Sequence, residues 1–303
     1  MKFFELIPSN TNFDFIGKFK IFVVLSIVSI TATLVGVSQK GFNFGIDFTG
    51  GSMIQARFNE VTPIEDVRAT LEKIGIEGAS VVEMGASHHD FLITARNTDT
   101  TTNLDRKFVE AIGKDKLTIQ QADVVGPKVG SELRASALRS LFYSMVLIMI
   151  YIWFRFDFRF APGATVALIH DVIVASGFYL FTGREFTITA VAALLTIAGY
   201  SVNDTIVIYD RVRELMRVGG EKIDMKVTIN RAINLTLSRT LLTSAFTALV
   251  VVPLILITEG EIQSFAMCMM VGLFVGSYST IYVAAPMTIY TERYLNRNKA
   301  KAR

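Results

Sequence analysis

Six apolar segments of this chain are each long enough to cross the hydrocarbon core of a bilayer as a helix. Backbone groups find no water in that core, so an isolated spanning segment satisfies them best as a helix. Hydrophobic residues make up 51% of the sequence and charged residues 19%, which agrees with a chain that lies partly in lipid. We therefore predict six transmembrane helices: Phe19–Ser38, Leu138–Phe154, Ala164–Phe181, Ile188–Tyr209, Ile233–Thr258 and Ile262–Pro286.

A long polar insert, Gln39–Ala137, separates the first span from the second, whereas the other five spans follow one another closely. The close spacing predicts a compact all-α membrane bundle. Within the insert, alternating and helical patterns occur in the order β-α-β-β-α-β, which is the ferredoxin-like arrangement. The predicted elements are strands Ser52–Phe58, Ser80–Met84, Phe91–Ala95 and Leu117–Val124, and helices Ile64–Ile74 and Thr102–Ile112.

The basic residues predict the orientation of the chain, because Lys and Arg concentrate in short loops on the cytoplasmic side. On one side of the bundle, segment 182–186 contains only Arg184, and segment 259–261 contains no basic residue. We therefore expect both termini in the cytoplasm and the insert outside. The opposite side carries Lys2, Lys18, Lys20, Arg155, Arg159, Arg211, Arg213, Arg217, Lys222, Lys226, Arg231, Arg293, Arg297, Lys299, Lys301 and Arg303.

This reading divides the chain into four parts: the N-terminus with the first span (1–38), the exterior domain (39–137), spans two to six (138–286), and a basic cytoplasmic tail (287–303). Between spans four and five, Glu221–Asn234 is polar with scattered apolar positions. Two interpretations of that stretch remain open: an amphipathic helix on the cytoplasmic face, or a solvated helical connector.

Asp204 interrupts the otherwise apolar fourth span, and an ionisable residue at that depth suggests a functional site. Arg239 interrupts the fifth span. Asp204 lies five residues before Tyr209, and Arg239 lies six residues after Ile233. At 1.5 Å per residue, both are about 8–9 Å inside the same boundary, so antiparallel neighbouring spans could present them to each other.

The residue types suit a proton site. Burial disfavours a charged carboxylate and a nearby arginine favours it, while arginine itself stays protonated, so only Asp204 would switch. Asn203 and Ser201 could orient that carboxylate, and Thr205 could assist. Two other interpretations remain open: a static buried ion pair, or an Arg239 side chain that extends to the headgroups.

Other motifs are less specific. His170 and Asp171 lie near the middle of the third span, where they could extend a proton relay or hold spans three and four together. His88–His89 has neither a cysteine nor a second histidine pair nearby, so we expect no metal site. No P-loop, Gly-x-Gly-x-x-Gly or Cys-x-x-Cys occurs. We therefore expect no cofactor, no nucleic-acid partner and no enzymatic activity.

The octapeptide FGIDFTGG (44–51) stands just after the first span. Gly50 and Gly51 allow a tight backbone turn before the first strand, and Asp47 could cap that turn. Gly45 belongs to the same motif. A second motif, GPKVG, begins with Gly126 and Pro127 and leads into a helix continuous with the second span.

Together these motifs resemble the SecF family, membrane subunits of the bacterial SecDF protein-translocation accessory complex. The resemblance covers nearly the whole chain and rests on FGIDFTGG, GPKVGSELRASAL, ALIHDVIV, IAGYSVNDTIVIYDRVRE and NLTLSRTLLTS. It implies membership of the resistance–nodulation–division superfamily, whose members have twelve spans in two pseudo-symmetric halves. Six spans would form one half, so the resemblance implies a SecD partner.

The resemblance also implies a role for individual residues. The family's proton-path aspartate matches Asp204 within SVNDT, and its arginine matches Arg239 within SRT. A further essential aspartate belongs to SecD. Asp171 matches a recurring His-Asp pair. The implied activity is proton-motive-force-driven extraction of preproteins from the SecYEG channel in the bacterial inner membrane, with small accessory membrane subunits as further candidate partners.

Two rival functions belong to other classes. A half-sized proton-driven exporter of lipids or small molecules would share the proton site, but it would need a substrate funnel in the exterior domain. A purely structural scaffold for SecYEG would need Asp204 only for stability. Copurification with SecD and SecYEG favours translocation or the scaffold over the exporter.

Overall fold

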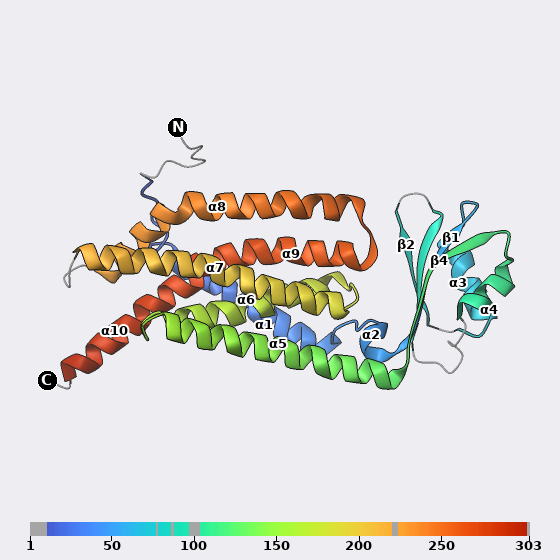
Figure 1. Cartoon of the computed structure of the whole chain (residues 1–303), viewed down its shortest axis with the longest axis horizontal. Helices are drawn as coiled ribbons and strands as arrows, with labels where there is room; N and C mark the ends of the chain where they lie inside the picture. Colours follow the sequence, from blue (N-terminus) through green and yellow to red (C-terminus); the bar gives the residue numbers. More distant parts are fainter. Residues whose placement is uncertain (1–10, 77, 86–87, 97–103, 220–223, 302–303) are drawn as a thin grey trace.

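The computed structural model describes residues 11–76, 78–85, 88–96, 104–219 and 224–301. It consists of a helical bundle with a small α/β domain attached to one end (Figure 1). Six helical segments within the described residues are long and apolar enough to cross a membrane, as the sequence predicts. Lys2, Lys222 and Arg303, which contribute to the predicted orientation, and the first residues of the predicted helix at Thr102 lie outside the described residues.

The spans form because each apolar segment satisfies its backbone hydrogen bonds internally. The last span contains a π-helical turn, η1, at Thr280–Ala284, and the chain changes direction between α9 and α10 (Figure 1). A π turn inside a helix is a recognised cause of such a bend. The helices are α1 Phe19–Lys40, α5 Pro127–Arg155, α6 Ala161–Thr182, α7 Ile188–Gly219, α8 Met225–Ile257, α9 Gly260–Ser279 and α10 Ala285–Lys301.

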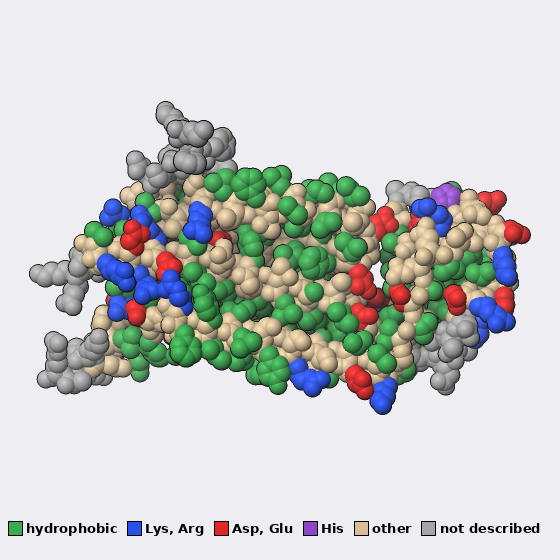
Figure 2. Space-filling model, viewed as in Figure 1, with side chains coloured by type: hydrophobic (Ala, Val, Ile, Leu, Met, Phe, Trp, Pro, Cys, Tyr) green, Lys and Arg blue, Asp and Glu red, His purple; other side chains and the backbone are tan. Residues whose placement is uncertain are grey.

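Helices α6, α7 and α9 form the centre of the bundle, and α1, α5 and α8 lie at its periphery. The peripheral helices expose many large apolar side chains, for example Phe154, Leu256 and Ile257. Figure 2 shows a broad band of apolar side chains over the bundle, with blue basic side chains gathered at the end opposite the α/β domain. An apolar band of this kind suits contact with lipid or with other membrane helices.

The structure changes three boundaries from the sequence analysis. Helix α5 begins at Pro127, so the boundary between 137 and 138 falls inside one continuous helix. Helix α10 continues to Lys301, so the basic segment after 287 is helical where it is described. The described part of Glu221–Asn234 is not a separate surface helix. It forms the first turns of α8 because Asp224 caps Lys226 N and Ile229 and Ile233 pack into the core.

The α/β domain contains an antiparallel four-stranded sheet in the order β2-β3-β1-β4. Apolar side chains from alternate strand positions, such as Ile54 and Ile93, pack with Phe108 of α4 to form its core. The other face of the sheet points away from that core. The elements are β1 Gly51–Phe58, α3 Ile64–Lys73, β2 Ser80–Met84, β3 Asp90–Arg96, α4 Leu104–Ile112 and β4 Leu117–Val125.

Candidate functional site

Asp204 lies on α7 at the centre of the bundle and is only 3% exposed. Its Oδ2 atom is buried and has no hydrogen-bond partner among the residues that the structure describes. Arg239 of α8 is close enough to act electrostatically on Asp204, but the described residues contain no ion pair between the two. Arg239 itself is exposed on the outside of the chain. Asp204 is therefore a buried carboxylate with free hydrogen-bonding capacity.

Asp171 of α6 is 0% exposed, and both of its carboxylate oxygens contact polar side chains. Its Oδ1 lies 2.7 Å from His170 Nδ1, and its Oδ2 accepts a 2.7 Å hydrogen bond from Ser279 Oγ and another from Ser201 Oγ. The cluster joins α6, α7 and α9. His170 Nε2 is buried and has no hydrogen-bond partner within the described part of the chain, so one nitrogen of the imidazole is unpaired there.

Polar contacts continue from this cluster along the neighbouring helices. Thr205 Oγ1 lies 3.1 Å from Thr280 Oγ1, and Thr280 is the first residue of η1. On the other side, the His170 ring packs against Tyr278, whose hydroxyl lies 2.7 Å from Ser26 Oγ of α1. Single π turns inside helices frequently occur at functional sites. Here the π turn begins where the polar contacts of α6 and α7 meet.

Helix α7 presents a second, outward face. Asn203 directly precedes the buried Asp204, yet it is exposed. Ala192, Thr196 and Gly199 are exposed on the same face, at intervals of three and four residues. Small residues permit close approach of another helix, and a carboxamide within a span is a suitable interhelical hydrogen-bonding group.

The Gly-Gly motif forms the joint between the bundle and the α/β domain. Gly50 and Gly51 have φ angles of 75° and 143°, which favour glycine. A Cβ atom at Gly51 would lie 2.4 Å from Ala95 O, and one at Gly50 would lie 2.8 Å from Pro127 Cα. The short helix α2 (Ile46–Thr49), the sheet and the start of α5 therefore meet without room for side chains at this turn.

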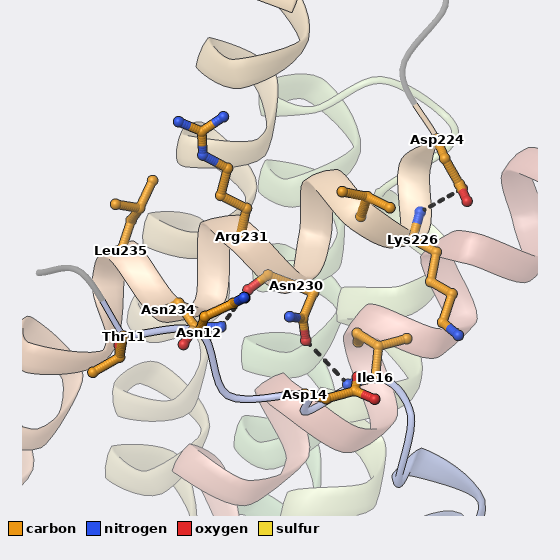
Figure 3. Close-up of a pocket in the computed structure, with 11 residues that line it drawn as sticks. Thr11, Asn12, Asp14, Ile16, Asp224, Lys226, Asn230, Arg231, Asn234 and Leu235 are labelled. Carbon is orange, nitrogen blue, oxygen red and sulfur yellow. Dashed lines mark hydrogen bonds between the residues drawn. The ribbon is translucent and has the colours of Figure 1, made fainter.

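A cavity of about 650 Å³ lies at the opposite end of the bundle. Figure 3 shows the segment from Thr11 to Ile16 crossing the start of α8 beside it. Asn234 Oδ1 accepts from Phe13 N at 2.8 Å, and Asn234 Nδ2 donates to Phe13 O at 2.9 Å. Asn230 Oδ1 accepts from Phe15 N at 2.9 Å. These bonds tie the start of the described chain to the helix that carries Arg239.

A family model described as protein export membrane protein SecD/SecF, C-terminal, matches residues 105–294. A second, the SecD/SecF GG motif, matches residues 35–60. Protein translocase subunit SecF of Calditerrivibrio nitroreducens is 38% identical over 290 residues, which cover 94% of this chain and 95% of that protein. The chain belongs to the SecF family. SecF of Rickettsia conorii is 37% identical over 299 residues, covering 97% of this chain and 96% of that protein.

The fold of this SecF-family chain also resembles a solved structure. The crystal structure of SecDF, a translocon-associated membrane protein from Thermus thermophilus, matches it with a TM-score of 0.85 and 33% identity. The match covers 95% of this chain and 40% of the SecDF chain. This chain therefore spans less than half of that SecDF protein. The likeness supports a SecD partner for a multi-pass membrane protein with an accessory role in Sec translocation.

The structure assigns two predicted residues of this SecF-family chain to different contacts. Ser201 donates to Asp171 instead of orienting Asp204, because its side chain points toward α6. Asp47 does not cap the Gly-Gly turn. Its Oδ2 accepts from Ile188 N at 2.9 Å, in the first turn of α7, where free backbone N–H groups need an acceptor. The motif thereby also holds α7.

Two further residues of the polar centre were missed by the sequence analysis. Ser279 donates to Asp171, and Thr280 meets Thr205. A usable signal existed, since Ser279 and Thr280 are adjacent polar residues inside the apolar sixth span. Gly272 and Gly276 let α9 approach α7 closely, because Cβ atoms there would meet Ile197 and Ser201 of α7 at 2.3 Å and 3.0 Å.

Proposed function

We propose that this chain acts with a SecD partner in the bacterial inner membrane to draw preproteins out of the SecYEG channel, driven by the proton motive force. Both termini would lie in the cytoplasm and the α/β domain outside. The proposal is supported by the SecF relatives and by the likeness to part of a SecDF chain. The gathering of basic side chains at the end opposite the α/β domain is the expected charge pattern of a cytoplasmic end (Figure 2).

The SecD partner would contact the outward face of α7. That face carries Asn203 and the small residues Ala192 and Gly199, which favour close helix packing. Asn203 would then hydrogen-bond across the interface instead of facing lipid. Arg239, exposed on α8, would lie near the same interface, because it acts electrostatically on Asp204.

The observation that carries the proton hypothesis is the free Oδ2 atom of Asp204. A buried carboxylate without a donor is costly when ionised, so it favours binding a proton or approaching a positive group. Protonation would alternate with closer pairing to Arg239, which remains positively charged. His170 and Asp171 would then either extend the proton path or hold α6, α7 and α9 together.

A shift of α7 would reach the α/β domain through the Gly-Gly joint. Asp47, within the motif, accepts from Ile188 N of α7, while Gly50 and Gly51 contact the start of α5 and the sheet. The motif therefore connects the helix carrying the carboxylate with the domain proposed to handle polypeptide. One charge crossing 100 mV corresponds to about 2.3 kcal/mol, which can bias such a movement.

Preprotein transport into inverted membrane vesicles tests this proposal. Vesicles lacking the native complex receive SecD with the wild-type chain, Asp204→Asn, or the matched control Asp210→Asn. Asp210 lies on the same helix but pairs with Arg155 near the bundle end. We expect gradient-dependent completion with the wild type and control only. If Asp204→Asn assembles normally and responds equally to the gradient, the carboxylate is structural and a scaffold function is favoured.

A further inference from the structure

A cleft separates the α/β domain from the adjoining end of the bundle. Its volume is about 530 Å³, within the range of about 300–1,000 Å³ that is common for binding sites. One wall is the open face of the sheet. The other consists of the end of α6 with the α6–α7 connection (182–185), and of Glu259 with the start of α9. The cleft therefore lies between the two parts of the molecule proposed to move against each other.

The sheet wall has the character of a polypeptide-binding surface. Val81 of β2 is buried in the domain core, so Val82 points to the open face, where it is 53% exposed. Met53 and Leu92 line the same wall. β2 is an edge strand of the sheet and lies on the side of the domain nearest the bundle (Figure 1). An exposed edge strand can accept an additional extended strand through its backbone groups.

The charge of the cleft selects among possible occupants. Four glutamates and one arginine line it, and Figure 2 shows acidic side chains gathered at this junction. Arg184 is held by neutral partners, donating to Ser264 Oγ at 2.8 Å and Gln263 Oε1 at 3.0 Å. Glu259 is exposed and forms no ion pair with any residue that the structure describes. Glu185 lies 3.5 Å from Arg96, and Glu83 lies beside His88. The uncompensated negative charge beside the apolar strand edge therefore lies on Glu259 and Glu261, for which the described residues contain no ion pair.

We propose that this cleft binds an extended segment of unfolded polypeptide that carries basic and apolar side chains. The segment adds to the edge of β2, its apolar side chains contact Val82 and Leu92, and its basic side chains approach Glu259. The inference rests on the proposed function, because a preprotein emerging on the exterior side would supply such segments. Backbone pairing gives affinity without a fixed sequence, which suits a substrate that differs from one protein to the next.

Peptide binding to the full chain assembled with SecD in nanodiscs of zwitterionic lipid tests the cleft, without any proton gradient. The probe is a fluorescent unstructured peptide of Lys, Ser and Val, and its match carries Glu in place of Lys. We expect the lysine peptide to bind at least about tenfold more tightly, because like charges disfavour the glutamate peptide. Glu259→Gln should weaken lysine-peptide binding about threefold, as expected for an exposed charge.

A matched pair of variants locates the binding site. Val82→Lys places a positive charge in the cleft and should weaken lysine-peptide binding at least about tenfold. Val124→Lys makes the same change on β4, the opposite edge strand, where Val124 is 64% exposed and does not line the cleft. That variant should stay within about twofold of the wild type. Circular dichroism and SecD copurification confirm that both variants remain folded and assembled.

Three outcomes overturn the cleft proposal: equal effects of the two lysine variants, no binding of either peptide by the folded complex, or release of SecD by Val82→Lys in place of a loss of peptide binding. The last outcome would assign the cleft to SecD itself. Asp204→Asn separates this proposal from the proposed function. This variant should retain peptide binding while losing the response to the gradient. The peptide-binding assay therefore tests the cleft, and the transport assay tests the proton site.

Discussion

Asp171 and Asp204 are buried carboxylates on neighbouring helices of one bundle, and their surroundings differ. The carboxylate of Asp171 contacts the side chains of Ser201, Ser279 and His170, which come from three helices. Asp204 has a buried oxygen with no hydrogen-bond partner, and Arg239 acts on it without forming an ion pair in the described chain.

Burial alone does not make a carboxylate a proton-binding site. A buried charge is stable when donors satisfy it, and removing those donors is costly. Asp171 has the contacts of a residue that joins α6, α7 and α9. Asp204 lacks such donors at Oδ2, which fits the proposal that its proton or its partner changes during function. The two regions should therefore respond differently to the same substitution.

The largest expected effect on stability comes from Asp171→Asn. The substitution replaces one carboxylate oxygen, which accepts hydrogen bonds, with an NH2 group, which donates them and would face other donors. We therefore expect a loss of about 3 kcal/mol in the free energy of unfolding. Asp204→Asn should change it by less than about 1 kcal/mol, because no hydrogen bond to its free oxygen is lost. Denaturant unfolding of the SecD complex in mixed micelles measures both. Equal losses would remove the distinction between the two carboxylates.

Ser201→Ala and Ser279→Ala test the two serine donors of Asp171 separately. Each removes one hydrogen bond to the Asp171 carboxylate, so we expect a loss of about 2 kcal/mol from each. Thr196→Ala on the exposed face of α7 is the control and should cost no more than about 0.5 kcal/mol. If Ser201→Ala abolished gradient-dependent transport while leaving stability unchanged, Ser201 would belong functionally with Asp204.

Asn234→Ala tests the link between the start of the chain and the Asp204 region. Asn234 binds both backbone groups of Phe13 and lies on α8, five residues before Arg239. We expect a loss of about 1 kcal/mol in stability, together with slower gradient-dependent transport. Thr243→Ala, further along α8, is the control, since its hydroxyl bonds only within its own helix. Unchanged transport in Asn234→Ala would separate this contact from the proton site.

The smallest effect is expected at Glu185, a partly buried carboxylate outside the spans that lies 3.5 Å from Arg96. Burial raises the pKa of Glu185, and Glu261 and Asp47 raise it further, while Arg96 opposes them. A carboxyl with a raised pKa in the folded state binds its proton more tightly there. Its contribution to stability is therefore complete below the unfolded-state pKa of about 4.3 and is lost as pH rises through the folded-state value.

Glu185→Gln removes the titrating carboxyl, so it should also remove this loss of stability with rising pH. The Tm of the wild-type complex should fall relative to that of the variant as pH increases from about 4. Thermal unfolding across a pH series measures the difference, with exposed Glu132→Gln as the control. A pH-independent difference between wild type and Glu185→Gln would show that the carboxyl does not titrate within this window.

Six spans and an α/β domain between the first two could be predicted from the sequence alone. Length and apolar composition are sufficient to predict a span, and alternating strand positions predict a sheet with one buried face. Asp204 and Arg239 were also recognisable from the sequence, because charged residues inside apolar segments are costly and therefore conspicuous. The continuous start of α8 was not recognisable, since its scattered apolar positions are buried only by packing against other helices.

Which polar groups meet could not be predicted from the sequence, because it depends on how the helices pack. Ser201 lies one turn from Asp204 on α7, yet it donates to Asp171 on α6. Asp47 lies beside a Gly-Gly turn, yet it accepts from Ile188 N, 141 residues away. The physical reason is that the sequence of a helix gives the depth and face of each side chain, while its hydrogen-bond partner depends on which neighbouring helix covers that face.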